Sequence, residues 1–108
     1  MARPIKEEFP KWRPKTVTMF LLGFGDERLK YKTIRNSSSS FTQRKDVRGF
    51  IFKRDKYQCV LCGSKENLQL DHVHSIYQVA KNLYPIELLN TEDNLQTLCK
   101  KCNERKSP

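Results

Sequence analysis

Two Cys-x-x-Cys pairs constrain this chain more than any other feature. The cysteines stand at positions 59, 62, 99 and 102, and 36 residues separate the two pairs. Each pair places two thiolates within one tight turn, where they can occupy two corners of a tetrahedron. Gly63 follows the first pair, and a turn around a metal ion often needs a positive φ at that position. We predict a structural zinc ion bound by Cys59, Cys62, Cys99 and Cys102, with no open position for substrate.

The size of the chain favours the same interpretation. With 108 residues, 37% of them hydrophobic, it has little apolar surface to bury and needs a further source of stability, such as a bound metal ion or disulfides. An extracellular disulfide scaffold would usually carry cysteines at a higher density. A redox-active Cys-x-x-Cys would need a thioredoxin-like βαβ setting, which the sequence does not suggest.

Positive charge is concentrated in the first half of the chain. Residues 1–57 contain 15 lysines and arginines against 6 acidic residues, whereas residues 58–108 contain 6 of each. Such one-sided basicity is typical of proteins that bind a polyanion such as DNA. The alternative is a surface whose charge serves only solubility.

The chain shows no signal peptide and no membrane span at the level of sequence. It begins with a charged segment, and its longest apolar run, residues 19–24, is far shorter than the roughly 20 residues that cross a bilayer. We therefore expect a cytoplasmic protein with no membrane partner.

The N-terminal part is expected to be an extension over residues 1–40. Residues 16–23 favour a strand, residues 25–28 favour a turn and residues 29–34 alternate with lysines, which predicts a β-hairpin. The serine-rich stretch at 36–40 indicates a flexible joint. A second domain would then cover residues 41–108.

A basic amphipathic helix is predicted at about residues 42–55. Ser40 and Gln43 have capping-box spacing, and Val47, Phe50 and Ile51 recur at helical intervals. A charged helix face is often simply solvated, but this one could also contact phosphates. The candidate DNA contacts are Arg44, Lys45, Arg48, Lys53 and Arg54.

The second half of the chain predicts two short strands and two short helices. Residues 68–73 alternate apolar and polar, which is the strand period, and a strand should end near His72. A short helix at 75–83 should stop before Pro85, a second strand is expected at 94–98, and residues 100–106 should form a final helical turn or two. Together these elements predict a small α+β zinc domain.

Residues of about 47–106 resemble the HNH endonuclease family, whose ββα-metal site lies between two strands and a following helix. The matching motifs are Arg54-Asp55-x-Tyr57-x-Cys59-x-x-Cys62-Gly63, then Leu70-Asp71-His72, then Asp93-Asn94-Leu95-Gln96-x-Leu98-Cys99-x-x-Cys102-Asn103-x-x-Lys106.

The resemblance implies hydrolysis of a DNA phosphodiester to 5′-phosphate and 3′-hydroxyl ends. Asp71 and Asn103 would hold one catalytic divalent ion, His72 would be the general base, and Asn94 would help to orient His72. Oxygen ligands suit Mg²⁺ or Mn²⁺, and an imidazole titrating near pH 6.5 can deprotonate water. Two features depart from many members: Asn103 replaces a histidine, and no proline follows the Asp-His pair.

A regular strand would send Asp71 and His72 to opposite faces, so a shared site requires the strand to end or twist there. The same geometry places His74 on the face of His72, which makes His74 a rival base or an extra ligand. An ordinary surface or hydrogen-bonded histidine is the simpler interpretation of His74.

Other functions fit parts of the sequence. A zinc ribbon could use Asp71 and Asn103 only as turn caps, a zinc module could bind DNA without cutting it, and an adaptor could bind another protein through an exposed hairpin. One site per chain cuts one strand, so double-strand cleavage would need two events or a homodimer. Apolar residues of the predicted hairpin, Phe20, Leu22 and Phe24, could mediate such pairing.

Overall fold

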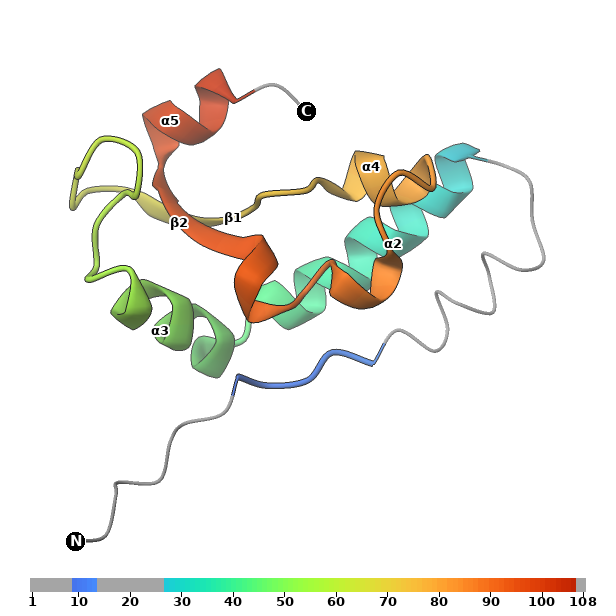
Figure 1. Cartoon of the computed structure of the whole chain (residues 1–108), viewed down its shortest axis with the longest axis horizontal. Helices are drawn as coiled ribbons and strands as arrows, with labels where there is room; N and C mark the ends of the chain where they lie inside the picture. The colour runs from blue at the N-terminus through green and yellow to red at the C-terminus, as the bar shows by residue number, and fades with distance from the viewer. Residues whose placement is uncertain (1–8, 14–26, 107–108) are drawn as a thin grey trace, which may run out of the picture.

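The computed structural model describes residues 9–13 and 27–106 of the chain. This part confirms the expected α+β class, with helices around a two-stranded antiparallel sheet (Figure 1). The elements in chain order are α2 (Glu27–Thr42), α3 (Lys45–Arg54), β1 (Leu68–His72), α4 (Ile76–Ala80), the 3₁₀ turns η1 (Ile86–Leu88) and η2 (Glu92–Asn94), β2 (Leu95–Cys99) and α5 (Lys100–Arg105).

The register of the sheet separates two sets of side chains. Leu68 pairs with Cys99 and His72 pairs with Leu95, so residues of even number in β1 share one face. On that face Leu70 and Leu95 pack against the buried Val47 and Ile51 of α3 and complete a core. The other face is covered by α5, whose residues contact both strands (Figure 1).

The predicted hairpin is wrong in its second strand. Residues 29–34 lie in α2, which continues through the serines at 37–40, so the expected joint and the boundary at residue 40 both fall inside a helix. Tertiary packing explains this. Ile34, Ser38 and Phe41 are buried at helical spacing, and such a stripe overrides the low helix propensity of serine. The other predicted strand, at 16–23, lies outside the described residues, as do Phe20, Leu22 and Phe24.

The basic helix is confirmed as α3, but the capping box that should start it is not. Ser40 lies inside α2, where its hydroxyl donates to the carbonyl of Asn36, and α3 begins later, with Arg44 as its N-cap. Gln43 donates instead to the Ser39 hydroxyl at 3.0 Å. The chain therefore turns a corner between two helices at the point where we expected one helix to begin.

A short N-terminal segment closes the open side of this corner. The ring of Phe9 meets Phe41 and Phe50 edge-on, with centroids 5.8 and 5.2 Å apart. Trp12 packs against the cores on both sides, one around Ile34 and the other around Phe41. Residues 9–13 therefore belong to the folded body, where no element was predicted.

The remaining short elements agree with expectation. Ser75 caps α4, accepting from the amide of Gln78 while the Gln78 side chain accepts from the Ser75 amide, which is a complete capping box. Within the two described ranges, no helix combines the length and the hydrophobicity that crossing a bilayer requires.

Candidate functional site

The four cysteines converge on one point, as the sequence predicts. Their sulfur atoms all lie within 4.8 Å of one another, and those of Cys62 and Cys99 are 3.6 Å apart. Four thiolates around zinc at about 2.3 Å would be about 3.8 Å from each other. Gly63 has φ +79° and donates to the carbonyl of Cys59, which closes the turn around the first pair. The cluster fits a structural zinc ion.

Local hydrogen bonds prepare some of these sulfurs for a cation. Burial acts to raise the pKa of Cys59. Hydrogen bonds from backbone amides to its sulfur outweigh this effect and lower the pKa to about 6. The pKa of Cys99 is also lowered, chiefly by the backbone amide of Cys102. The pKa of Cys102 is raised to about 12, chiefly by its hydrogen bond to Cys99. The Cys102 thiol therefore keeps its proton until a bound cation balances the charge of the neighbouring thiolates.

Asp71 projects from β1 toward α5 and accepts hydrogen bonds from one amide and one ammonium group. Its Oδ2 accepts from Gln96 of β2 at 2.9 Å and from the Lys106 ammonium, just beyond α5, at 2.6 Å. Lys106 also donates to the main-chain carbonyls of His72 and Val73. A positive charge is thus held by three oxygens at the end of β1.

This oxygen set has the composition that a hard divalent ion requires. Asn103 lies on α5 above the same face of the sheet, where its Nδ2 donates to Gln69 at 2.7 Å. The Oδ1 atom is therefore the one that could ligate an ion. Asp71 and Asn103 thus offer oxygen ligands from the same side of the sheet, and the Lys106 ammonium pairs with the carboxylate.

His72 faces the other way, as a regular strand requires. Its Nε2 lies 2.7 Å from Oδ1 of Asn90 and 3.3 Å from the Ser38 hydroxyl of α2. Ser38 in turn donates to the same Asn90 oxygen at 3.2 Å. A serine, a histidine and an asparagine thus form a closed triangle in which Ser38 and Asn90 are buried. Neither Ser38 nor Asn90 was predicted.

The orientation of the Asn90 amide favours one tautomer of His72. With Oδ1 of Asn90 toward the ring, the amide accepts, and the tautomer that pairs with it carries its proton on Nε2 and its lone pair on Nδ1. Burial lowers the pKa of His72 below its usual 6.5, against the raising effects of Asn90 and of the Asp71 charge. The ring is therefore neutral at neutral pH.

Asn94 acts on the backbone beside His72. Its buried side chain accepts from the amide of His74 at 2.7 Å and donates to the carbonyls of His74 and Leu89. These bonds hold the segment that follows β1. The His74 ring stacks on Tyr84, with centroids 4.2 Å apart, and its Nδ1 contacts Gln78. These contacts give His74 a local structural role.

The five candidate DNA contacts of α3 differ in what they touch. Arg54 pairs with Asp55 and donates to the carbonyls of Glu92 and Leu95, which ties α3 to β2. We therefore give Arg54 a structural role. Arg44 pairs with Asp46 at the exposed start of α3, and Arg48 lies over the ring of Phe52. Lys45 and Lys53 are exposed on the same helix.

Comparison with known proteins identifies the group to which this arrangement belongs. The family model described as HNH endonuclease matches residues 59–108, which hold all four cysteines together with Asp71, His72, Asn94 and Asn103. A protein of Lactococcus phage SK1 described as "Probable HNH endonuclease" is 31% identical over 84 residues, covering 73% of this chain and 87% of the phage protein.

The chain belongs to the HNH endonuclease family. No solved structure matches it. The alignment with the phage protein covers more than the matched motif, so the likeness extends into the helical part that precedes the cysteines. Membership supports a nuclease and confirms the resemblance drawn from the sequence.

Proposed function

We propose that this HNH protein is a metal-dependent DNA endonuclease that hydrolyses phosphodiester bonds. The observation that carries the proposal is the pair of opposed groups at the end of β1. Asp71, with its cation, lies on one face, and His72, with its lone pair directed by Asn90, lies on the other. Hydrolysis needs a proton acceptor for water and relief of negative charge on the phosphate; His72 would supply the first, and a divalent ion held by Asp71 would supply the second.

The substrate phosphate would lie across the free edge of β1. In the described part of the chain β1 pairs with β2 alone, so its other edge has no strand partner. A phosphate there could be reached by Asp71 from one face and by His72 from the other. This position resolves the expected conflict between neighbouring residues that point in opposite directions.

In the proposed reaction Nδ1 of His72 takes a proton from a water molecule. The water oxygen forms a bond to phosphorus, the bond to the 3′ oxygen breaks, and that oxygen takes a proton from solvent, which leaves 5′-phosphate and 3′-hydroxyl ends. Asp71 and Asn103 would hold one Mg²⁺ or Mn²⁺ ion, which when bound supplies charge stabilisation to the phosphate and the leaving oxygen. Asn94 keeps the segment after His72 in place.

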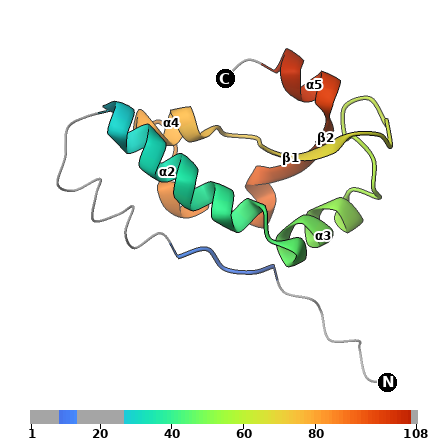
Figure 2. The same cartoon turned by 180° about the vertical axis from the view of Figure 1, so that it is seen from behind.

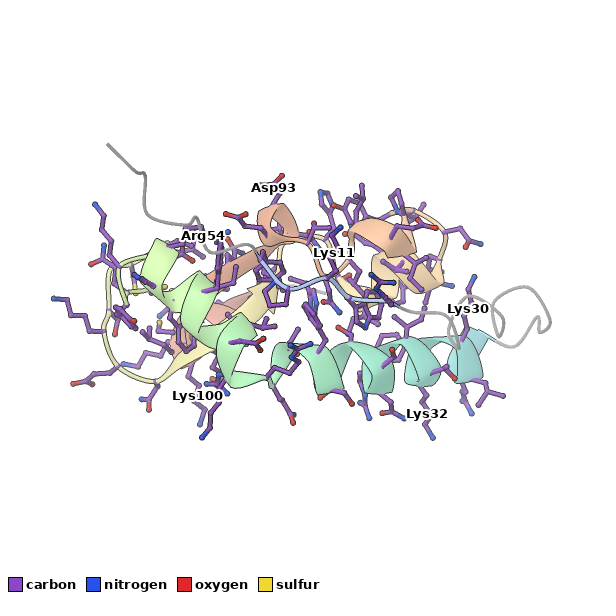
Figure 3. The ribbon with its side chains drawn as sticks, turned by 90° about the horizontal axis from the view of Figure 1, so that it is seen from below. Lys11, Lys30, Lys32, Arg54, Asp93 and Lys100 are labelled. Atoms are coloured by element: carbon purple, nitrogen blue, oxygen red, sulfur yellow. The ribbon has the colours of Figure 1, made fainter. Side chains whose placement is uncertain are left out.

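Relaxation of supercoiled plasmid tests this function. We expect the wild-type protein to produce nicked circles with Mg²⁺ or Mn²⁺, and Asp71→Asn to nick about 10²- to 10³-fold more slowly, because it removes the charged ligand. Asp93→Asn removes one acidic group at an exposed position on η2, where the side chain points outward (Figure 3), and should leave the rate unchanged. Binding of DNA without any cutting by the wild type would instead favour a non-catalytic DNA-binding module.

Asn90 is proposed to position the base and not to touch the substrate. Replacing it with leucine removes the acceptor of the His72 proton, and we expect kcat for nicking to fall about 10- to 100-fold, as for other groups that orient a functional histidine. Affinity for DNA should hardly change.

Asn90→Asp distinguishes positioning from a loss of packing. The aspartate keeps an acceptor and should restore much of the rate, but its charge stabilises the imidazolium and raises the pKa of His72. The acid limb of the pH profile should therefore move to higher pH than in the wild type. If Asn90→Leu and Asn90→Asp lose activity equally, with the same pH profile as the wild type, Asn90 has no such role.

A further inference from the structure

A basic groove between α2 and α4 lies beside the proposed site and takes no part in it. It has a volume of about 540 Å³, and its walls carry four cations and two tyrosines. Figure 2 shows α4 alongside the N-terminal half of α2. The residues that line it are Arg28, Leu29, Tyr31, Lys32, Arg35, Tyr77, Ala80 and Lys81.

The spacing of its cations suits a phosphate backbone. Arg28, Lys32 and Arg35 follow each other at intervals of four and three residues on one side of α2, a rise of about 6 and 4.5 Å along the helix. All three are exposed. In Figure 3 the Lys32 side chain points away from the body of the molecule.

The opposite wall adds an aromatic surface. Tyr77 of α4 is 48% exposed, and the Lys81 ammonium lies 5.6 Å from the centre of its ring. Aromatic rings flanked by cations are the usual construction of sites for unpaired nucleotides, where the bases stack and the phosphates pair with charge.

The two helices that form the groove carry or adjoin residues close to His72. On α2, Ser38 stands one helical turn beyond Arg35 and contacts the His72 ring. On the other side, α4 begins four residues after His72, and its N-cap Ser75 is three residues away. A strand in the groove would therefore lie near the residues that hold His72.

We propose that this α2–α4 groove binds a single-stranded segment of the DNA substrate, with phosphates against Lys32 and Arg35 and a base stacked on Tyr77. Substrates with unpaired nucleotides beside the cut should then bind more tightly than continuous duplex. The inference rests on the proposed function only in taking DNA as the ligand, and binding without a catalytic divalent ion is measured separately from cleavage.

Fluorescence anisotropy with a labelled single-stranded oligonucleotide tests the charges. For the zinc-loaded Lys32→Ala/Arg35→Ala variant, we expect weaker binding and a plot of log K against log salt that is shallower by about 1.4, the value for two lost phosphate contacts on a single strand. Lys65→Ala/Lys101→Ala removes the same charge from exposed positions near the cysteines and should leave the slope near that of the wild type.

Tyr77 tests the stacking contribution. Tyr77→Ala should weaken binding of the single strand fivefold or more and leave binding of continuous duplex unchanged, whereas Tyr77→Phe keeps the ring and should bind like the wild type. Equal effects of the two double variants on the salt slope, or equal affinity of Tyr77→Ala and the wild type for the single strand, would overturn the proposal. Loss of plasmid nicking with this binding pattern intact would count against the nuclease function alone.

Discussion

His72→Ala should abolish nearly all plasmid nicking, with a fall of about 10²- to 10⁴-fold in the rate, the range that a general base contributes. The reason is structural: Asn90 directs the proton of His72 to Nε2, which leaves Nδ1 to accept a proton from water. Rates of nicked-circle formation at saturating DNA measure the effect. Circular dichroism and DNA affinity should remain close to those of the wild type.

His74→Ala is the matched control, because His74 is the other histidine of the chain and lies two residues away. Its stacking on Tyr84 and its contact with Gln78 predict a small effect on stability and a rate within a few fold of the wild type. If His74→Ala loses the activity and His72→Ala keeps it, the assignment of the base is reversed.

The pH profile provides a second test of His72. The base must be neutral, and burial lowers its pKa below 6.5. As the pH falls, the rate should therefore drop to half of its plateau at a pH below 6.5, where the ring takes up a proton. A midpoint above 6.5 would mean that another group limits the reaction.

The sequence predicted the half of the molecule that contains the four cysteines well, because short-range chemistry determines it. Cysteine spacing fixes two turns around one ion, and Gly63 has the positive φ that its position implied. The alternation of residues 68–72 correctly predicted β1, but the strand stays regular through His72, without the end or twist that a site shared by Asp71 and His72 would need. Each of these inferences needed only neighbours in the chain or a ligand set with known geometry.

The helical half was harder because its stability comes from distant contacts. Four serines in succession suggested a joint, yet Ile34 and Phe41 fall on one side of a helix that spans them. The spacing of Tyr31, Ile34 and Phe41 did indicate a helix, but the low helix propensity of the four serines argued against it. Residues 9–13 gave no signal, since they pack on a corner that exists only after α2 and α3 have met.

The positioning residues of the site were invisible for a related reason. Asn90 lies in the connection between α4 and β2, 18 positions from its partner His72, and Ser38 lies 34 positions before His72. No motif links them. Arg54 shows the converse: a basic residue on a basic helix suggested DNA, but its partners are Asp55 and two carbonyls. Charge in a sequence indicates what a surface attracts and does not identify which cations bind within the fold.

Removing the zinc should cost the fold more than any other single change. Free energies of structural zinc binding, about 10–16 kcal/mol, match or exceed the whole stability of an ordinary domain. The cysteine cluster also carries the third core, in which Leu98 packs on Cys59 and Cys99. Cys99 ends β2, and α5 follows at once, so loss of the ion releases Asn103 and Lys106 from the site.

Cys102→Ser tests this dependence against Cys102→His, which keeps a nitrogen ligand in a Cys₃His set. We expect Cys102→Ser to lose zinc and to lower the melting temperature by about 15 °C or more, since 1 kcal/mol corresponds to about 4–8 °C in a domain of this size. Cys102→His should retain one zinc ion per chain and unfold within a few degrees of the wild type.

Measured zinc content and thermal denaturation test this prediction. A Cys102→Ser protein that melts like the wild type would show that the hydrophobic cores suffice for stability. Nicking by the serine variant should be lost along with the fold, because the helix that carries Asn103 depends on the same ion.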